Sequence, residues 1–132
     1  LQEIQGGCSY FHQDSYYWRT EPQLGCNCWI PMSDVAKDAI ALAVMPGSHA
    51  SWVLAEHESY YDDPPMGSEI GGFRPFKRHR IKAELVDFSK ETLIPMQAGD
   101  GLFFTNFTWH RSEPNRSGRD MAFYAIAYNR AG

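Results

Sequence analysis

The feature that most constrains the fold is a series of short apolar runs, each followed by turn-forming residues such as proline, glycine or asparagine. Their length and their content of β-branched and aromatic residues are typical of β-strands. The only helix signal is weak and covers residues 48–58, with Ser48 as its N-cap. Many short strands with few helices predict an all-β chain, a sandwich or barrel of the jelly-roll type. The predicted strands cover residues 8–11, 24–32, 40–45, 81–88, 101–107 and 121–128.

One long segment, residues 55–82, departs from this pattern. It is rich in glycine, proline and charge, and its length is typical of a functional loop or lid. We expect its two histidines, His57 and His79, to be solvated. Its basic residues also read as a solvated loop, although focused positive charge can attract an anionic substrate. These residues are Arg74, Lys77, Arg78 and Arg80.

Composition excludes several classes of function. Twelve Lys and Arg against sixteen Asp and Glu give a net charge of −4, which argues against a nucleic-acid partner. No apolar run approaches the ~18 residues of a membrane span, so no membrane partner is expected. Three cysteines, Cys8, Cys26 and Cys28, are too few for a disulfide scaffold. We therefore expect a cytoplasmic protein whose Cys26 and Cys28 lie in a core or pocket wall rather than on zinc.

The length of 132 residues predicts a single domain over residues 1–132. The chain starts at Leu1 and enters an apolar run almost directly after Gly6 and Gly7. We therefore expect an N-terminus that is processed, truncated or otherwise incomplete.

The strongest chemical signal is the triplet His12-Gln13-Asp14. Side chains two apart on a strand share a face, so the imidazole and the carboxylate can lie side by side. His110 follows another predicted strand near the other end of the chain. Two histidines and one carboxylate form the facial triad of non-haem Fe(II) oxygenases, which leaves positions open for a co-substrate and oxygen. His49, in a Pro-Gly turn, reads as structural.

A cation and a hydroxyl follow the second histidine. Ser112 is two residues after His110, and Arg119 is nine residues after it, at the start of the last predicted strand. A guanidinium binds a carboxylate through two parallel hydrogen bonds, so this pair suits a co-substrate that carries a carboxylate. Arg111 is expected to point to the opposite face of the strand from His110.

Five blocks of sequence together resemble the phytanoyl-CoA dioxygenase family of Fe(II)/2-oxoglutarate oxygenases. They read FHQD, CNCWIPMSD, MPGSH, AGDGLFF and WHRSEPNRSGRD, and the resemblance runs from about Gly6 to Tyr128. It implies a double-stranded β-helix, a distorted jelly roll of two sheets with the metal between them. Members of the family are usually longer, with N-terminal helices that buttress one sheet.

The resemblance also implies an activity and the residues that serve it. The chain would be a dioxygenase that hydroxylates a small organic molecule with Fe(II), O2 and 2-oxoglutarate, and releases succinate and CO2. Because Asp14 is present, hydroxylation is expected rather than halogenation. The iron ligands would be His12, Asp14 and His110. The residues at the co-substrate would be Arg119 on its distal carboxylate, with Ser112, Trp29 and, less strongly indicated, Asn27 beside it.

Two alternatives stay open at this stage. One is a non-catalytic or truncated member of the same fold that binds metal without turnover. The other is a cupin-like metal enzyme or a sugar-binding jelly roll, although the His-x-His pair and glutamate ligand usual in cupins are not found. The sequence identifies neither the small-molecule substrate nor the oligomeric state.

Overall fold

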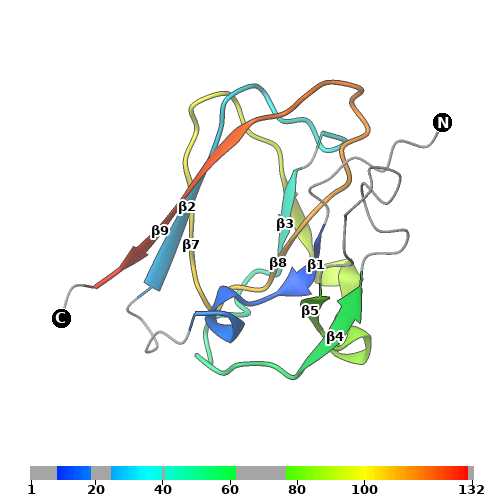
Figure 1. The fold of residues 1–132 in the computed structure, drawn as a ribbon, viewed down its shortest axis with the longest axis vertical. Coiled ribbons are helices and arrows are strands. Elements are labelled where there is room, and N and C mark those ends of the chain that lie inside the picture. Colours follow the sequence, from blue (N-terminus) through cyan, green and yellow to red (C-terminus); the bar gives the residue numbers. More distant parts are fainter. Residues whose placement is uncertain (1–8, 19–24, 40, 62–76, 131–132) are drawn as a thin grey trace.

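The fold is built from two antiparallel sheets that face each other (Figure 1). A computed structural model describes residues 9–18, 25–39, 41–61 and 77–130. The four-stranded sheet has the order β1-β8-β3-β6 and the three-stranded sheet the order β7-β2-β9. The first comprises β1 (Ser9–His12), β8 (His110–Ser112), β3 (Leu42–Val44) and β6 (Thr92–Ile94), and the second β7 (Leu102–Thr105), β2 (Gly25–Pro31) and β9 (Phe123–Asn129). Two facing sheets, with most of the described structure in strands and loops, confirm the predicted jelly-roll class.

Strand β2 fixes which side chains face the space between the sheets. Asn27 lies opposite Phe104 of β7 and Ala127 of β9, so these three share one face. That face is the inner one, because the ring of Phe104 lies 4.6 Å from that of His110 on the other sheet. Residues 26 and 28 therefore point outward.

Both described cysteines lie on this outer face of β2. Cys28 is buried and Cys26 partly buried, and both are free thiols. The prediction of core cysteines holds for Cys28, but neither side chain faces the space between the sheets.

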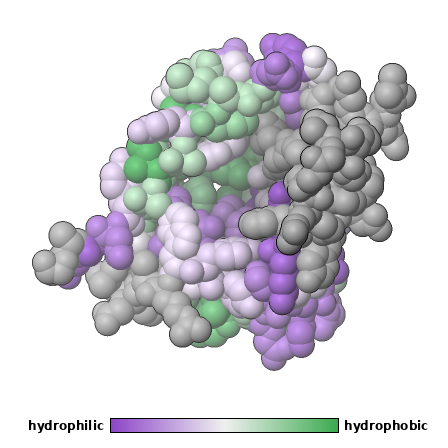
Figure 2. Space-filling model, in the orientation of Figure 1, coloured by the Kyte–Doolittle hydropathy of each residue, from purple (hydrophilic) through white to green (hydrophobic). Residues whose placement is uncertain are grey.

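Two small apolar clusters hold these layers together. Val35, Ala41 and Met96 form one, against which residues of both sheets pack, among them Trp29 and Ile94. Phe11, Ala43, Met45 and Ile81 form the other, which packs strand β5 (Lys77–Ile81) against β1 and β3. Full burial of the larger side chains in these clusters, the valine, isoleucine, methionines and phenylalanine, stabilises each by about 1.5–3 kcal/mol. Figure 2 shows the surface hollowed between the two sheets, with hydrophobic residues gathered along its upper rim.

The segment predicted as a loop or lid contains a hairpin. Strands β4 (His57–Tyr61) and β5 (Lys77–Ile81) pair in antiparallel register, and β5 lies beside β1. The cross-strand pair Glu58 and Arg80, with 2.7 Å between Oε1 and Nε, stabilises strands that are too polar to show an apolar pattern. The expectation of a continuous loop over 55–82 was therefore wrong at both ends. Its middle, residues 62–76 with Arg74, lies outside the described residues.

Two other expectations about local structure were wrong. The strand predicted over residues 81–88 is absent beyond Ile81, the last residue of β5, and two short 3-10 helices follow, η2 (Ala83–Leu85) and η3 (Phe88–Lys90). Residues 48–58 form no helix: a turn ends at residue 51, irregular chain follows and β4 begins at His57, and the Ser48 hydroxyl accepts a hydrogen bond from the Trp109 amide instead of capping. The remaining described helix is η1 (Asp14–Tyr16). Among the described residues, no helix has the length and apolar character needed to cross a membrane.

Candidate metal centre

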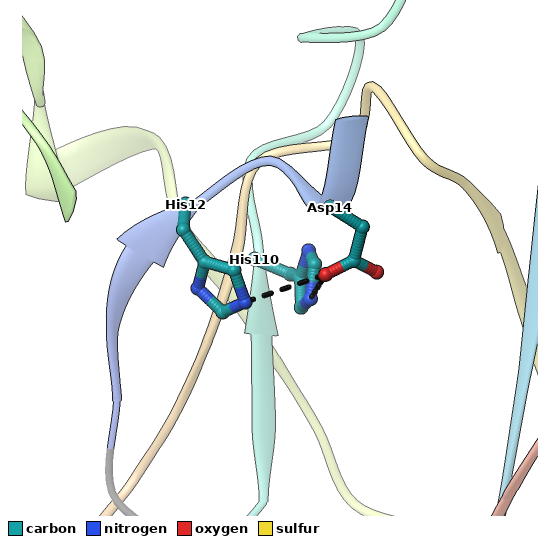
Figure 3. A group of neighbouring side chains, drawn as sticks. All are labelled: His12, Asp14 and His110. Atoms are coloured by element: carbon teal, nitrogen blue, oxygen red, sulfur yellow. Dashed lines mark ion pairs between the residues drawn. The ribbon is translucent and has the colours of Figure 1, made fainter. Parts of the chain in front are cut away.

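The three residues predicted as ligands converge between the sheets. His12 ends β1, Asp14 begins η1, and His110 opens β8 directly opposite His12 in the β1–β8 pairing. Asp14 Oδ1 lies 3.5 Å from His12 Nε2 and 3.6 Å from His110 Nε2 (Figure 3). One donor atom from each residue lies within 4.8 Å of the other two. The geometry differs from the expected strand alternation, because the chain turns into η1 after His12 and this turn brings Asp14 back toward it.

Both histidines are oriented by the same local hydrogen bond. His12 Nδ1 donates to the carbonyl of Tyr10 at 2.9 Å, and His110 Nδ1 donates to the carbonyl of Thr108 at 2.9 Å. A carbonyl only accepts, so each Nδ1 carries a proton, and in the neutral ring the lone pair is then on Nε2. Such outer hydrogen bonds fix the tautomer of metal-binding histidines. The two Nε2 atoms face the same carboxylate oxygen.

Asn27 holds the carboxylate from the other sheet. Its Nδ2 donates to Asp14 Oδ2, which leaves Oδ1 facing the two histidines. Burial raises the pKa of Asp14, but the contacts with His12, His110 and Asn27 together outweigh it and hold the pKa below 3.8. Asp14 is therefore an anion at neutral pH. From the sequence, Asn27 was predicted to lie at the co-substrate, and its contact with Asp14 was not predicted. The sequence feature that indicated an inward-facing Asn27 is its position two residues before Trp29 on the same strand.

His110 is the most deeply buried member of the set. Its side chain is enclosed by the rings of Phe104 and His12, at 4.6 and 4.3 Å between centroids. Burial, with the neighbouring His12, lowers the pKa of His110 from 6.5 to about 4. The imidazole is therefore neutral at physiological pH, the form that binds a metal ion.

This pKa predicts how the stability of the metal-free chain depends on pH. Between about pH 6.5 and 4 the unfolded chain protonates His110 while the folded chain does not, so acid favours unfolding. We expect the free energy of unfolding to fall as the pH is lowered through this window. Urea unfolding at pH 7, 5.5 and 4.5 measures the slope, and His110→Asn should reduce it. An equal slope in His110→Asn would show that the low pKa of His110 is not the cause of the pH dependence.

The donor set fits a non-haem iron site. Two imidazole nitrogens and one carboxylate oxygen, clustered within 4.8 Å, match the 2-His-1-carboxylate donor set. The carboxylate's second oxygen is already occupied by Asn27, which favours monodentate binding. The residues present thus suit Fe(II) and leave its remaining positions for other ligands.

Trp29 and Ser112, two of the residues predicted at the co-substrate, lie on the strands that carry Asn27 and His110. Trp29 is on the inner face of β2, two residues from Asn27, and stacks on Phe123 at 4.2 Å. Ser112 lies two residues beyond His110 on β8, and its hydroxyl accepts from Ser9 Oγ at 3.4 Å. Their positions are compatible with a wall of the space between the sheets.

Arg119 is exposed in the loop between β8 and β9. Its backbone is fixed: the carbonyl accepts from Asn115 Nδ2 at 2.7 Å and the amide donates to Ser117 Oγ at 3.3 Å. Within the described chain its guanidinium makes no hydrogen bond or ion pair, so it is available to an external carboxylate. Its predicted role stays a prediction.

Arg111, His57 and His79 each contact neighbouring side chains of the protein. Arg111 points away from His110, as expected, and binds Glu91 through two hydrogen bonds of 2.8 Å. His57 and His79 are half-buried against the ring of Tyr16, so the expectation that both are solvated was wrong. His49 lies in the turn as predicted.

Comparison with protein families identifies the group to which this chain belongs. The profile of the phytanoyl-CoA dioxygenase (PhyH) family matches residues 2–121, most of the sequence. The chain belongs to the phytanoyl-CoA dioxygenase family. No curated protein sequence matches it significantly. All three residues of the candidate metal centre lie within the span that matches the PhyH profile.

Solved structures share the fold of this PhyH-family chain. EvdO2 from Micromonospora carbonacea var. aurantiaca, in complex with 2-oxoglutarate, superposes with a TM-score of 0.72 at 19% identity. The match covers 97% of this chain and 47% of EvdO2. The non-heme monooxygenase ThoJ matches with a TM-score of 0.70 at 19% identity, over 96% of this chain and 41% of ThoJ. The chain therefore spans about half the length of the solved structures that it resembles.

Proposed function

We propose that the chain is the metal-binding core of an Fe(II)- and 2-oxoglutarate-dependent dioxygenase that hydroxylates a small organic molecule. The observation that carries the proposal is the convergence of His12, Asp14 and His110 within a PhyH-family fold. The complex of the similar EvdO2 with 2-oxoglutarate supports the choice of co-substrate. Succinate and CO2 would be the co-products.

The residues divide the work of the site. Bound iron would supply the oxidising chemistry by combining O2 with the 2-oxo acid. The metal would be held by His12 Nε2, His110 Nε2 and Asp14 Oδ1. The hydrogen bond from the Nδ1 of each histidine keeps both imidazoles in the tautomer that can bind a metal through Nε2. Asn27 keeps Asp14 from using its second oxygen. The protein's part is to hold metal, co-substrate and substrate in register.

The co-substrate would be held at its far end by a cation. A carboxylate removed from water needs a paired charge, because an unpaired buried carboxylate is costly. Arg119 carries a guanidinium without a partner in the described chain, and Ser112 and Trp29 would line the same space.

Arg119→Lys is therefore expected to weaken 2-oxoglutarate binding by about 1.5–3 kcal/mol, the value of a charge-assisted hydrogen bond. That corresponds to roughly ten- to a hundredfold in affinity. Lysine keeps the charge but lacks the planar fork. Calorimetric titration with metal present measures the change, and a 2-oxo acid without the distal carboxylate should bind both forms equally. Unchanged 2-oxoglutarate affinity would assign the carboxylate to another group.

Turnover tests the proposal as a whole. Succinate release from 2-oxoglutarate, screened against candidate small molecules, should require Fe(II) and increase with a true substrate. Metal binding without any succinate would instead favour a non-catalytic member of the same fold. The screen also narrows the substrate class, which the geometry leaves open.

A further inference from the structure

Gln13, between the two ligand residues His12 and Asp14, is completely buried, with 0% of its surface exposed. Glutamine is seldom fully buried, and burying its amide is costly unless its hydrogen bonds are made. Its side chain points away from the metal centre into the protein. A buried amide at this position calls for an explanation beyond filling space.

The Gln13 amide is held by two segments distant in the sequence. Nε2 donates to the carbonyls of Val53 at 3.0 Å and Phe107 at 2.9 Å, and Oε1 accepts from the Ala55 amide at 2.8 Å. Both donors are used, and the acceptor is used once. The Gln13 side-chain amide thus bridges the backbone of segment 53–55 and that of residue 107 by hydrogen bonds.

The anchor at Phe107 connects this amide with the second histidine. Phe107 is followed by Thr108, whose carbonyl orients His110 through Nδ1. Gln13 therefore ties the turn that carries His12 and Asp14 to the segment that sets the direction of His110. The β1–β8 pairing and the Ser15 amide, which donates to the Asn106 carbonyl at 3.0 Å, join the turn to the same part of the chain, and Gln13 adds the side-chain connection next to Thr108.

The His57 ring supports the same turn by accepting a hydrogen bond from the backbone N–H of Gln13. Its Nδ1 donates to the Ala55 carbonyl at 2.8 Å, so its Nε2 is the acceptor for the Gln13 amide N–H at 3.3 Å. Its ring stacks on Tyr16 at 4.3 Å and an interplanar angle of 24°. The lone pair of His57 is thereby used by the protein, and His57 serves the turn rather than the metal.

We infer that Gln13, assisted by His57, is a positioning residue that sets the placement of His12 and Asp14 relative to His110. This inference rests on the proposed metal site. Ligands must be held to within about 0.5 Å for a metal site to form well, and loss of an outer partner typically costs about 10- to 100-fold in metal affinity. The side chain contacts no metal or substrate; it acts through the backbone.

The test uses two replacements of Gln13 and a control. Gln13→Met keeps the length but makes no hydrogen bond, and Gln13→Glu keeps the shape but loses both N–H donors. Each should weaken Co(II) affinity by about 10- to 100-fold and change the Co(II) absorption spectrum, which reports coordination geometry. Val35→Ala, in the apolar cluster that packs both sheets, should lower stability and leave affinity and spectrum as in the wild type.

A second pair of variants keeps the inference testable if the Gln13 variants do not fold. His57→Phe keeps a ring on Tyr16 and removes the acceptor, whereas His57→Gln keeps an acceptor. The phenylalanine variant should weaken Co(II) binding, and the glutamine variant should restore part of it. If wild type and all these variants bind Co(II) equally and with one spectrum, the positioning role is wrong. A wild-type chain that binds no Co(II) would overturn the metal site itself.

Discussion

Replacing His12 or His110 with alanine is expected to abolish tight Fe(II) binding. Each imidazole is one of three protein donors that converge within 4.8 Å, so its loss leaves an imidazole and a carboxylate. The affinity should fall by more than the roughly 10- to 100-fold that loss of an outer partner costs. Anaerobic calorimetric titration of each variant with Fe(II) measures the effect.

A matched histidine serves as the control for this experiment. His49 lies in a turn with its ring against Trp52, away from the candidate ligands. His49→Ala should bind Fe(II) as the wild type does. If His12→Ala or His110→Ala also retains wild-type affinity, that residue is not a ligand.

Removal of the carboxylate is expected to separate metal binding from turnover. In Asp14→Gly the two histidines remain and water or a halide ion can take the vacated position, so part of the metal affinity should persist. Hydroxylation should fall to background, because the anionic ligand held by Asn27 is gone. Succinate release and product formation, measured beside Fe(II) affinity, test both halves.

Asp87→Gly provides the comparison for this variant. Asp87 caps the short helix η3 at the surface through Ser89, so its loss changes local stability but not the site. Its turnover should match that of the wild type. Full hydroxylase activity in Asp14→Gly would remove Asp14 from the site.

The apolar pattern predicted the strands that lie within a longer apolar run, and missed the polar strands β4 and β5 and the short strands β6 and β8. Apolar runs located β1, β2, β3, β7 and β9 to within a few residues. Strand β8 is only three residues long, and β4 and β5 are polar strands stabilised across the hairpin by Glu58 and Arg80. Residues 81–88 alternate like a strand, but all of them after Ile81 lie beyond the end of the β4–β5 pairing, where two 3-10 helices form instead.

The candidate ligands were predictable because their chemistry is local and distinctive. His12 and Asp14 are close in sequence, and the residues around His110 carry the family resemblance that the PhyH match confirms. The supporting residues were not predictable in the same way. Gln13 finds its partners 40 to 94 residues away, and Asn27 reaches Asp14 from the opposite sheet. Only the tertiary structure brings such groups together.

Anaerobic absorption spectroscopy tests the central claim most directly. Addition of Fe(II) and 2-oxoglutarate to the chain without oxygen should produce a visible charge-transfer band, because the 2-oxo acid then chelates iron held by His12, Asp14 and His110. The band should be absent with either reagent alone and in His110→Ala, and present in His49→Ala. A wild-type chain that binds Fe(II) but develops no band with 2-oxoglutarate would contradict the proposed oxygenase and leave only a metal-binding protein of this fold.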